Sequence, residues 1–472
     1  MNSDQFETGI PAPQGLYDFE QERDACGVGL VADLKNEPSH RIIEMGVTVL
    51  KRLMHRGAVG SDPETGDGAG IMLALPDEFF RLALPNQLPA RGRYGVAMMF
   101  GGCGHEEELE AAVTENGGRV TAWRQVPVNR DSIGKNAQRT CPLIRQLFID
   151  GSGFADQAEF ERKLFVMRRE MERRVEGCYV CSCSSRSIVY KGLFLGTQID
   201  GFYEDLADEH FKSPLALVHQ RYSTNTFPTW SLAHPFRYLA HNGEINTLRG
   251  NLNHLKVREP HLSSSLLGED LRKLLPLIPP GQSDSACLDN MVELLVAAGR
   301  DLRHVMLMLM PQAWGANYHL GPDVRGFFEY HSAMMEPWDG PTAVVFSDGV
   351  NAGAMLDRNG LRPARYTLTT DDIFILASET GVADIPAEKV GRRGRLRPGE
   401  MIYCDLVNHR LVSDAETKNE MARRMPYRRW VEKNKISVRS LFDSISASAE
   451  MPDLTAHQRR FGFTQEDVEL II

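Results

Sequence analysis

Asp24-Ala25-Cys26-Gly27-Val28-Gly29-Leu30 is the stretch that decides the fold. It places a cysteine at the head of a short apolar run, residues 26–32, whose composition predicts a β-strand. If such a cysteine became the first residue of a mature chain, its thiol would be a nucleophile. Its own α-amino group, with a pKa of about 7.7–8.0, would serve as the base. A cysteine in an apolar run is also commonly a buried packing residue, so other segments must decide between the two interpretations.

The composition sets broad limits on function. The 472 residues carry a formal net charge of −10, and 42% of them are hydrophobic. This balance is typical of a globular protein with enough apolar residues for a large core. A negative net charge disfavours nucleic acid as a partner, because binding phosphates needs clustered Lys and Arg. No apolar run reaches membrane-spanning length and the N-terminus lacks a secretory core, so we expect no membrane partner and a cytoplasmic location.

The cysteines do not follow a disulfide pattern, so we expect reduced thiols. They stand at positions 26, 103, 141, 178, 181, 183, 287 and 404. The cluster from Cys178 to Cys183 has no second Cys or His pair at a zinc-site interval, and packing is the favoured interpretation. Strand alternation predicts that Cys181 and Cys183 share one face and that Val180 lies on the other. We therefore predict no metal site.

The periodicity of apolar residues predicts a mixed α+β chain. Strands are expected at 26–32, 71–75, 94–100, 187–195, 215–219, 236–241, 326–331, 342–347, 351–356 and 373–377. Helices are expected at 40–55, 105–115, 157–176, 246–257, 285–299 and 415–434. Because strands are grouped and helices fall between them irregularly, the pattern favours a mixed or antiparallel sheet over a parallel barrel.

Three further segments could carry chemistry, and each also has an ordinary structural explanation. Arg221, in the run 219–230, could be a surface ion-pair partner. Asn242-Gly243 is a common hairpin turn, and Ser283 or Asp284 could cap the helix that follows. Taken together with a thiol, these residue types suit hydrolysis of an amide on an amino acid. A guanidinium matches an α-carboxylate, a carboxylate matches an α-ammonium, and an Asn amide with a Gly N–H can stabilise an oxyanion.

Five motifs carry a resemblance to a known family. They are Cys26-Gly27-Val28-Gly29, Met54-His55-Arg56-Gly57-Ala58, Gly66-Asp67-Gly68-Ala69-Gly70-Ile71, the run around Arg221, and His241-Asn242-Gly243-Glu244-Ile245-Asn246. Together they resemble the class II glutamine amidotransferases. The resemblance implies the N-terminal nucleophile hydrolase fold, a four-layer αββα sandwich with two antiparallel sheets.

More narrowly, residues 26–430 resemble the glutaminase domain of the glutamate synthase large subunit. The run 219–230, Ser283-Asp284-Ser285, the run 356–363 and the long interval between Cys26 and Arg221 carry this narrower likeness. The resemblance implies that Cys26 attacks the glutamine amide and that Asn242 and Gly243 form the oxyanion hole. It also implies that Arg221 and Asp284 hold the substrate's α-carboxylate and α-ammonium.

The same resemblance implies a pocket and a domain order. Residues from His55 to about Gly70 would close over glutamine, and Thr229 and Trp230 would line its pocket. Residues 1–25, which are acidic and polar, would be a leader removed before Cys26 acts. Residues 431–472 would be a linker and the start of the glutamate synthase central domain, so we expect a truncated chain.

The resemblance places no cofactor in this segment. FMN and an iron–sulfur cluster would belong to downstream domains, where ammonia would reach 2-oxoglutarate. Those domains and an NAD(P)H-oxidising small subunit would be partners. Two alternatives stay open: the glutaminase domain of another class II amidotransferase, and an unprocessed glutamine-binding fragment without catalysis.

Overall fold

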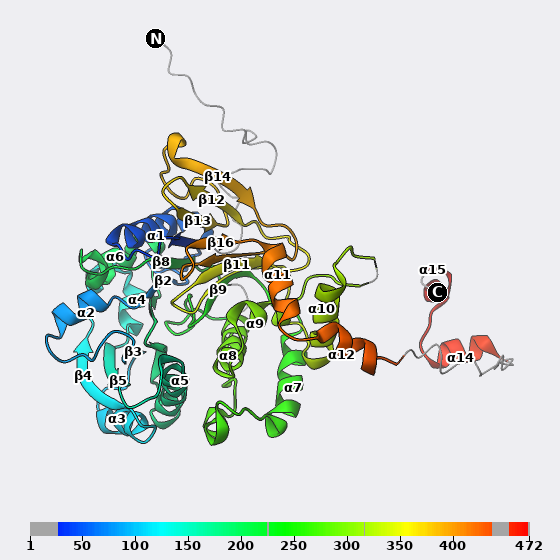
Figure 1. The fold of residues 1–472 in the computed structure, drawn as a ribbon, viewed down its shortest axis with the longest axis horizontal. Helices are drawn as coiled ribbons and strands as arrows, with labels where there is room; N and C mark the ends of the chain where they lie inside the picture. Colours follow the sequence, from blue (N-terminus) through cyan, green and yellow to red (C-terminus); the bar gives the residue numbers. More distant parts are fainter. Residues whose placement is uncertain (1–26, 224–225, 316, 437–452, 471–472) are drawn as a thin grey trace, which may run out of the picture. The chain divides into compact units, whose positions relative to one another are not determined.

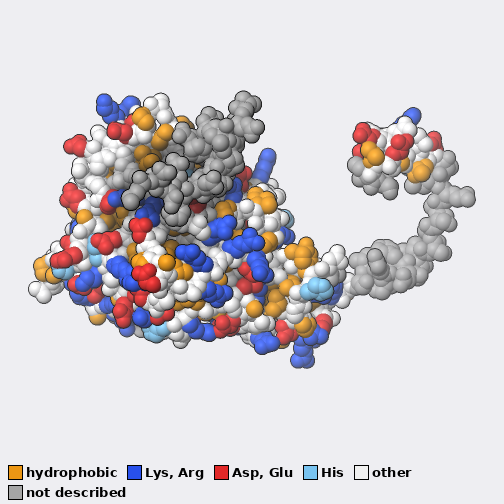
Figure 2. Space-filling view, turned by 90° about the horizontal axis from the view of Figure 1, so that it is seen from above, with side chains coloured by type: hydrophobic (Ala, Val, Ile, Leu, Met, Phe, Trp, Pro, Cys, Tyr) orange, Lys and Arg blue, Asp and Glu red, His pale blue; other side chains and the backbone are white. Residues whose placement is uncertain are grey.

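The computed structural model describes residues 27–223, 226–315, 317–436 and 453–470 (Figure 1). The chain forms two compact units, with the boundary between Arg428 and Arg429. Cys26 and the rest of the predicted leader lie outside the described residues. On the face shown in Figure 2, basic and acidic side chains are interspersed.

Three antiparallel sheets organise the first unit. The first sheet has the order β14-β12-β13-β1-β8-β2-β7. Its strands are β1 (Gly27–Asp33), β2 (Ala69–Ala74), β7 (Ser187–Gly192), β8 (Leu215–Gln220), β12 (Arg365–Thr369), β13 (Ile373–Ala377) and β14 (Val390–Arg395). The second sheet has the order β16-β15-β11-β10-β9. Its strands are β9 (Leu239–Gly243), β10 (Thr342–Ser347), β11 (Ala352–Leu356), β15 (Met401–Asp405) and β16 (Arg410–Val412).

The first two sheets pack face to face, because β1 and β8 contact β9 and β10. The helix α1 (His40–Arg52) covers the outer face of the first sheet (Figure 1). Glycines allow this close approach: a Cβ on Gly29 would lie 2.6 Å from Val49 Cγ1, and one on Gly46 would lie 2.8 Å from Ala216 Cβ. The helices α8 (Asp284–Ala297) and α11 (Asp414–Arg423) contact strands of the second sheet. The predicted α+β sandwich with two antiparallel sheets is confirmed.

The remaining helices surround these layers or belong to the second unit. They are α2 (Asp77–Ala83), α3 (Glu106–Thr114), α4 (Lys135–Thr140), α5 (Gln157–Arg174), α6 (Ile199–Phe202), α7 (Leu248–Arg258), α9 (Leu302–Leu309), α10 (Pro322–Met334), α12 (Tyr427–Asn434), α14 (Leu454–Arg460) and α15 (Gln465–Leu470). Among the described residues, no helix combines the length and the apolar character needed to cross a bilayer.

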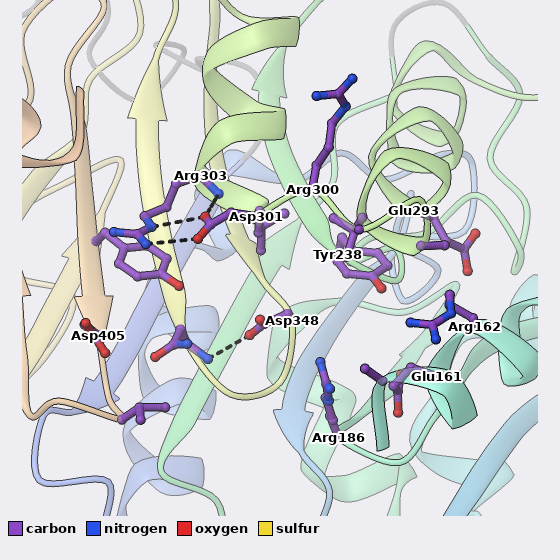
Figure 3. A pocket seen from close by; sticks show the side chains of 18 of the residues that line it. Glu161, Arg162, Arg186, Tyr238, Glu293, Arg300, Asp301, Arg303, Asp348 and Asp405 are labelled. Atoms are coloured by element: carbon purple, nitrogen blue, oxygen red, sulfur yellow. Dashed lines mark hydrogen bonds and ion pairs between the residues drawn. The ribbon is translucent and has the colours of Figure 1, made fainter. Parts of the chain in front are cut away.

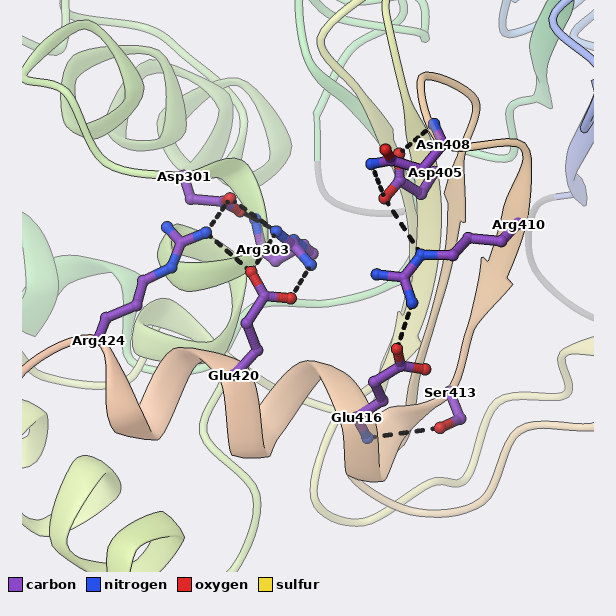
Figure 4. Close-up of polar contacts among 9 residues, drawn as sticks. All are labelled: Asp301, Arg303, Asp405, Asn408, Arg410, Ser413, Glu416, Glu420 and Arg424. Atoms are coloured by element: carbon purple, nitrogen blue, oxygen red, sulfur yellow. Dashed lines mark hydrogen bonds and ion pairs between the residues drawn. The ribbon is translucent and has the colours of Figure 1, made fainter.

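Ion pairs attach α11 to α9 (Figure 4). The Glu420 carboxylate accepts hydrogen bonds from both terminal nitrogens of Arg303, at 2.8 and 3.0 Å. Arg424 Nη2 donates to Asp301 Oδ2 at 2.9 Å. These contacts hold α11 against α9.

The third sheet is an addition to the predicted pair of sheets. It has the order β4-β5-β3-β6 and consists of β3 (Tyr94–Phe100), β4 (Arg119–Gln125), β5 (Ile144–Asp150) and β6 (Tyr179–Ser184). Helices α3 and α5 pack on it around a separate apolar cluster. The run 94–100 was expected as a strand, but its pattern could not show which sheet it joins.

The prediction that Cys181 and Cys183 share a face is wrong. The register of β6 against β3 shifts so that Met98 pairs with Ser182 and Met99 with Val180. This bulge at Cys181 reverses the alternation of the side chains. Cys181 consequently packs in the main core, and Cys183 packs against the apolar cluster under α5.

Two further element predictions need correction. Residues 326–331, expected as a strand, lie inside α10, because a short apolar run does not distinguish a strand from one side of a buried helix. The helix expected at 415–434 is two helices, α11 and α12, with Pro426 between them. Proline lacks the N–H that a continuous helix would need at that position.

Candidate active site

The N-terminal end of β1 lies beside the C-terminal end of β8. Gly27 is paired with Gln220, the residue before Arg221. Cys26 is joined directly to Gly27 and lies outside the described residues. The pairing of β1 with β8 therefore brings Gly27, which follows the predicted nucleophile in sequence, beside the residue that precedes the predicted guanidinium.

Arg221 is buried and held by the glycine-rich loop that precedes β2. Its backbone N–H donates to Gly68 O at 2.8 Å, and its Nη2 donates to Thr226 Oγ1 at 2.7 Å. The neighbouring Ser223 N–H donates to Asp67 Oδ2 at 2.6 Å. Burial raises the pKa of Asp67, while the Ser223 N–H and the Arg221 charge oppose that rise. The loop from His55 to Gly70 thus contacts the segment that carries Arg221.

Asn242 and Gly243 end β9, in the second sheet. Gly243 has a φ of +100°, and a Cβ there would lie 2.0 Å from Pro341 O, so only glycine fits. Thr342 Oγ1 donates to Asn242 O at 2.8 Å and fixes the peptide between the two residues. Asn242 Oδ1 is buried without a hydrogen-bond partner among the described residues.

Asp284 is the first residue of α8 and contacts the segment after Gly243. Its Oδ2 accepts a hydrogen bond from the Ile245 N–H at 3.1 Å. The N-cap is Ser283, whose hydroxyl accepts from the Ala286 N–H at 3.2 Å. Capping therefore explains Ser283, whereas the Asp284 carboxylate faces the turn that follows β9.

Residues in the run 356–363 form hydrogen bonds with the segment 339–342, which lies beside this turn. Arg358 makes two hydrogen bonds to the Asp339 carboxylate, at 2.7 and 2.9 Å. Arg362 Nε donates to Pro341 O at 3.3 Å. Asp357 Oδ1 accepts from the Thr342 N–H at 3.3 Å. Residues 339–342, which contact Asn242 and Gly243, are therefore held in place from behind.

Three buried imidazoles link the ends of β8 and β9. His219 Nε2 lies 3.0 Å from His241 O, and the His219 ring stacks on His234 with centroids 4.2 Å apart. Burial lowers the pKa of His219 to about 3 and lowers that of His234 well below its usual value. Burial also lowers the pKa of His241, although the nearby Asp284 charge opposes this. The three rings are therefore neutral when the protein is folded at neutral pH.

These imidazoles predict how stability depends on pH. The unfolded chain binds protons at these three histidines near pH 6.5, whereas the folded chain binds protons there only at lower pH. The free energy of unfolding should therefore fall below about pH 6.5, by up to about 1.4 kcal/mol per pH unit for each imidazole. Urea unfolding between pH 7 and 5 measures this slope. His234→Phe should reduce the slope by the contribution of one imidazole. An unchanged slope in His234→Phe would contradict the assignment of this pH dependence to the buried rings.

Thr229 and Trp230 do not lie with the other predicted residues in one hydrogen-bonded cluster. Trp230 is buried against Phe100, Phe194 and Phe202, and its Nε1 donates to Thr140 Oγ1 at 3.2 Å. Thr229 is exposed. Core packing alone explains the position of the indole, so the lining of a glutamine pocket by these two residues stays a prediction.

One hollow of about 560 Å³ lies between α5, α8 and β15, and charged side chains such as Arg186, Asp301 and Arg303 line it (Figure 3). Within the described ranges, no group of three or more His, Cys, Asp or Glu side chains is placed to hold a metal ion.

The chain is similar to known proteins over nearly its whole length. Residues 26–430 match the family of class-II glutamine amidotransferases. The chain is 48% identical to the glutamate synthase [NADPH] large chain of Bacillus subtilis, over 98% of this chain and 31% of that protein. It is 42% identical to the glutamate synthase [NADPH] large chain of Azospirillum brasilense, over 97% of this chain and 31% of that protein.

A solved structure, that of an allosteric regulatory enzyme of purine biosynthesis, is 15% identical. It covers 80% of this chain and 46% of that chain, with a TM-score of 0.36. The present chain thus spans about a third of the length of the curated relatives it matches. It belongs to the class-II glutamine amidotransferases and is homologous to glutamate synthase large chains.

Proposed function

We propose that this chain hydrolyses L-glutamine to glutamate and ammonia, with Cys26 as the nucleophile once residues 1–25 have been removed. The observation that carries the proposal is the contact between His219 and the His241 carbonyl, at 3.0 Å. It joins the end of β8, which leads to Arg221, to the end of β9, which carries Asn242 and Gly243. Asp284 contacts the same turn through Ile245.

The proposed reaction proceeds through a thioester. The α-amine of Cys26 accepts the thiol proton, and the sulfur attacks the side-chain amide carbon of glutamine. The carbonyl oxygen becomes an oxyanion that accepts hydrogen bonds from the Asn242 amide and the Gly243 N–H. The C–N bond then breaks as the α-ammonium returns the proton to the leaving nitrogen, which departs as ammonia. Water, deprotonated by the same amine, then attacks the thioester carbonyl carbon. The C–S bond breaks, glutamate is released, and the α-ammonium returns the proton to the Cys26 sulfur.

Arg221 and Asp284 would hold the two ends of the amino acid backbone. The planar guanidinium of Arg221 matches an α-carboxylate, and the Asp284 carboxylate matches an α-ammonium. Charges of both residues act on His241, whose pKa the Asp284 carboxylate raises and the Arg221 guanidinium lowers.

In a longer polypeptide the ammonia would pass to 2-oxoglutarate for glutamate synthesis. This part of the proposal rests on the similarity to glutamate synthase large chains, at 42–48% identity. FMN, an iron–sulfur cluster and an NAD(P)H-oxidising small subunit would then act with segments beyond this chain. The first unit contributes no described metal-ligand cluster to that chemistry. A domain of another class-II amidotransferase is the second candidate, which the family match alone supports equally.

The N-terminal mass of the purified chain tests the proposal most directly. We expect the active protein to begin at Cys26 and to release ammonia from glutamine, because only a free α-amine can act as the base. The measurement pairs intact-mass spectrometry with a glutaminase assay on the same sample. Full activity in a protein that keeps residues 1–25 would overturn the proposed base. A chain that begins at Cys26 and releases no ammonia would favour a binding fragment.

A further inference from the structure

A trough of about 560 Å³ lies on the outer face of the first sheet, over β12, β13 and β14. These strands lie beside α1 at the top of Figure 1. The apolar side chains of Ile375, Ala377, Val382 and Ile385 line the trough, together with three arginines.

Strand register shows which side chains share the trough face. Ala377 is paired with Gly29, whose missing side chain faces α1, and with Arg365 on its other side. Arg365 is paired in turn with Arg395. Because directly opposed residues in antiparallel strands point to the same face, Arg365 and Arg395 stand on the α1 side. Arg393 follows by the same rule through Thr367 and Ile375.

These three arginines are exposed and form no ion pair with any other described residue. The opposite wall, residues 379–385, is tied to α1 by Arg52. Its Nη1 donates to Gly381 O at 3.0 Å, and its Nη2 contacts Asp384 Oδ2 at 2.5 Å. The trough therefore has an apolar floor and three arginines along one side, while Glu379 on the other side is paired with Arg56. This arrangement fits an acidic segment that also carries apolar side chains.

One segment of this chain has that chemistry. Residues 16–24 read Leu-Tyr-Asp-Phe-Glu-Gln-Glu-Arg-Asp, with four acidic side chains and one basic one. In an extended conformation, Tyr17 and Phe19 would point to one side and Asp18, Glu20 and Glu22 to the other. With the segment lying along the trough, the aromatic side would face Val382 and Ile385 in the wall formed by residues 379–385, and the acidic side would face the arginines.

The segment is also close enough to β1 in the sequence to reach the trough. Phe19 precedes Gly27 by eight residues, which span at most about 28 Å when extended. The distance from β1 across β13 and β12 to β14 is three strand spacings, or about 14 Å. Gly29 is paired with Ala377, which lines the trough.

We infer that residues 16–24 dock in this trough before the leader is removed, with their carboxylates on Arg365, Arg393 and Arg395. The trough would thereby hold the chain on the N-terminal side of the Ala25–Cys26 bond against the sheet. This surface is separate from the proposed glutamine site, and its test does not use glutaminase activity.

Photo-crosslinking in the full chain tests the inference. The protein carries p-benzoylphenylalanine in place of Phe19 and Cys26→Ala, which removes the proposed nucleophile. Intact-mass spectrometry verifies that residues 1–25 are still attached before irradiation. Peptide mapping by mass spectrometry should find crosslinks to residues 365–395. Arg365→Ala, Arg393→Ala and Arg395→Ala together should lower the crosslink yield about tenfold, as expected for three exposed ion pairs, and 0.5 M NaCl should also lower it.

Arg392→Ala is the matched control. Arg392 lies in the same strand, but its guanidinium lies over the Tyr366 ring, 5.7 Å from the centroid, and outside the trough. The yield should be unchanged in this variant. If the triple alanine variant does not fold, the salt titration of the parent protein provides the same comparison. Crosslinks to another segment or to a second copy, or a yield insensitive to both the arginines and salt, would overturn the inference.

Discussion

Cys26→Ala is expected to lower the rate of glutamine hydrolysis by about 10⁴-fold or more, because it removes the atom that forms the thioester. Binding should survive, since Arg221 and Asp284 remain in place and both lie in well-packed parts of the fold. A glutaminase assay combined with calorimetric titration of glutamine separates the two quantities. The expected result is a variant that binds glutamine and does not turn it over.

Cys103→Ala is the natural control for this variant. Cys103 is the exposed thiol among the described cysteines, so it would compete with Cys26 for any thiol reagent. Its replacement should leave kcat and KM unchanged. Retention of a tenth or more of the activity in Cys26→Ala would contradict the nucleophile assignment, and the same loss in Cys103→Ala would move the assignment to another thiol.

Strand patterns predicted most of the sandwich because each buried strand has a local signature. Residues 342–347, 351–356 and 373–377 are continuous apolar runs of strand length, and each forms a strand within one residue of its expected bounds. Residues 326–331 were predicted wrongly because they lack such a signature. Phe327 and Phe328 are buried on a helix, and an apolar run of this length is too short to distinguish the helical period of 3.6 residues from the strand period of 2. The third sheet could not be predicted because strand partners depend on contacts distant in sequence.

The candidate site also has residues that the sequence predicts and supporting residues that it does not. Arg221, Asn242 and Asp284 stand in recognisable motifs, and the structure gathers them around the ends of β8 and β9. Thr342 and Asp339 lie about 100 residues from Asn242 and carry no local signal, yet they hold the turn that follows β9. The supporting contacts arise only from the pairing of β9 with β10, where Thr342 lies opposite Gly243.

Asn242→Ala should lower kcat by about 10²–10³-fold and change KM little, because an oxyanion donor acts mainly in the transition state. Arg221→Ala should show the reverse pattern, with the larger change in KM, because a carboxylate contact is made equally to bound glutamine and to the transition state. Steady-state kinetics on both variants, with thermal unfolding to verify the fold, measure the difference.

Asn242→Asp sharpens this test. The aspartate keeps the shape of the side chain and the Thr342 contact to the backbone carbonyl of residue 242, at 2.8 Å. It replaces the amide donor with an anionic acceptor, which would repel a developing oxyanion. Its kcat should therefore fall at least as far as that of Asn242→Ala. If the aspartate variant kept near-normal kcat, the side chain would act through packing, and Gly243 N–H would have to stabilise the oxyanion without it.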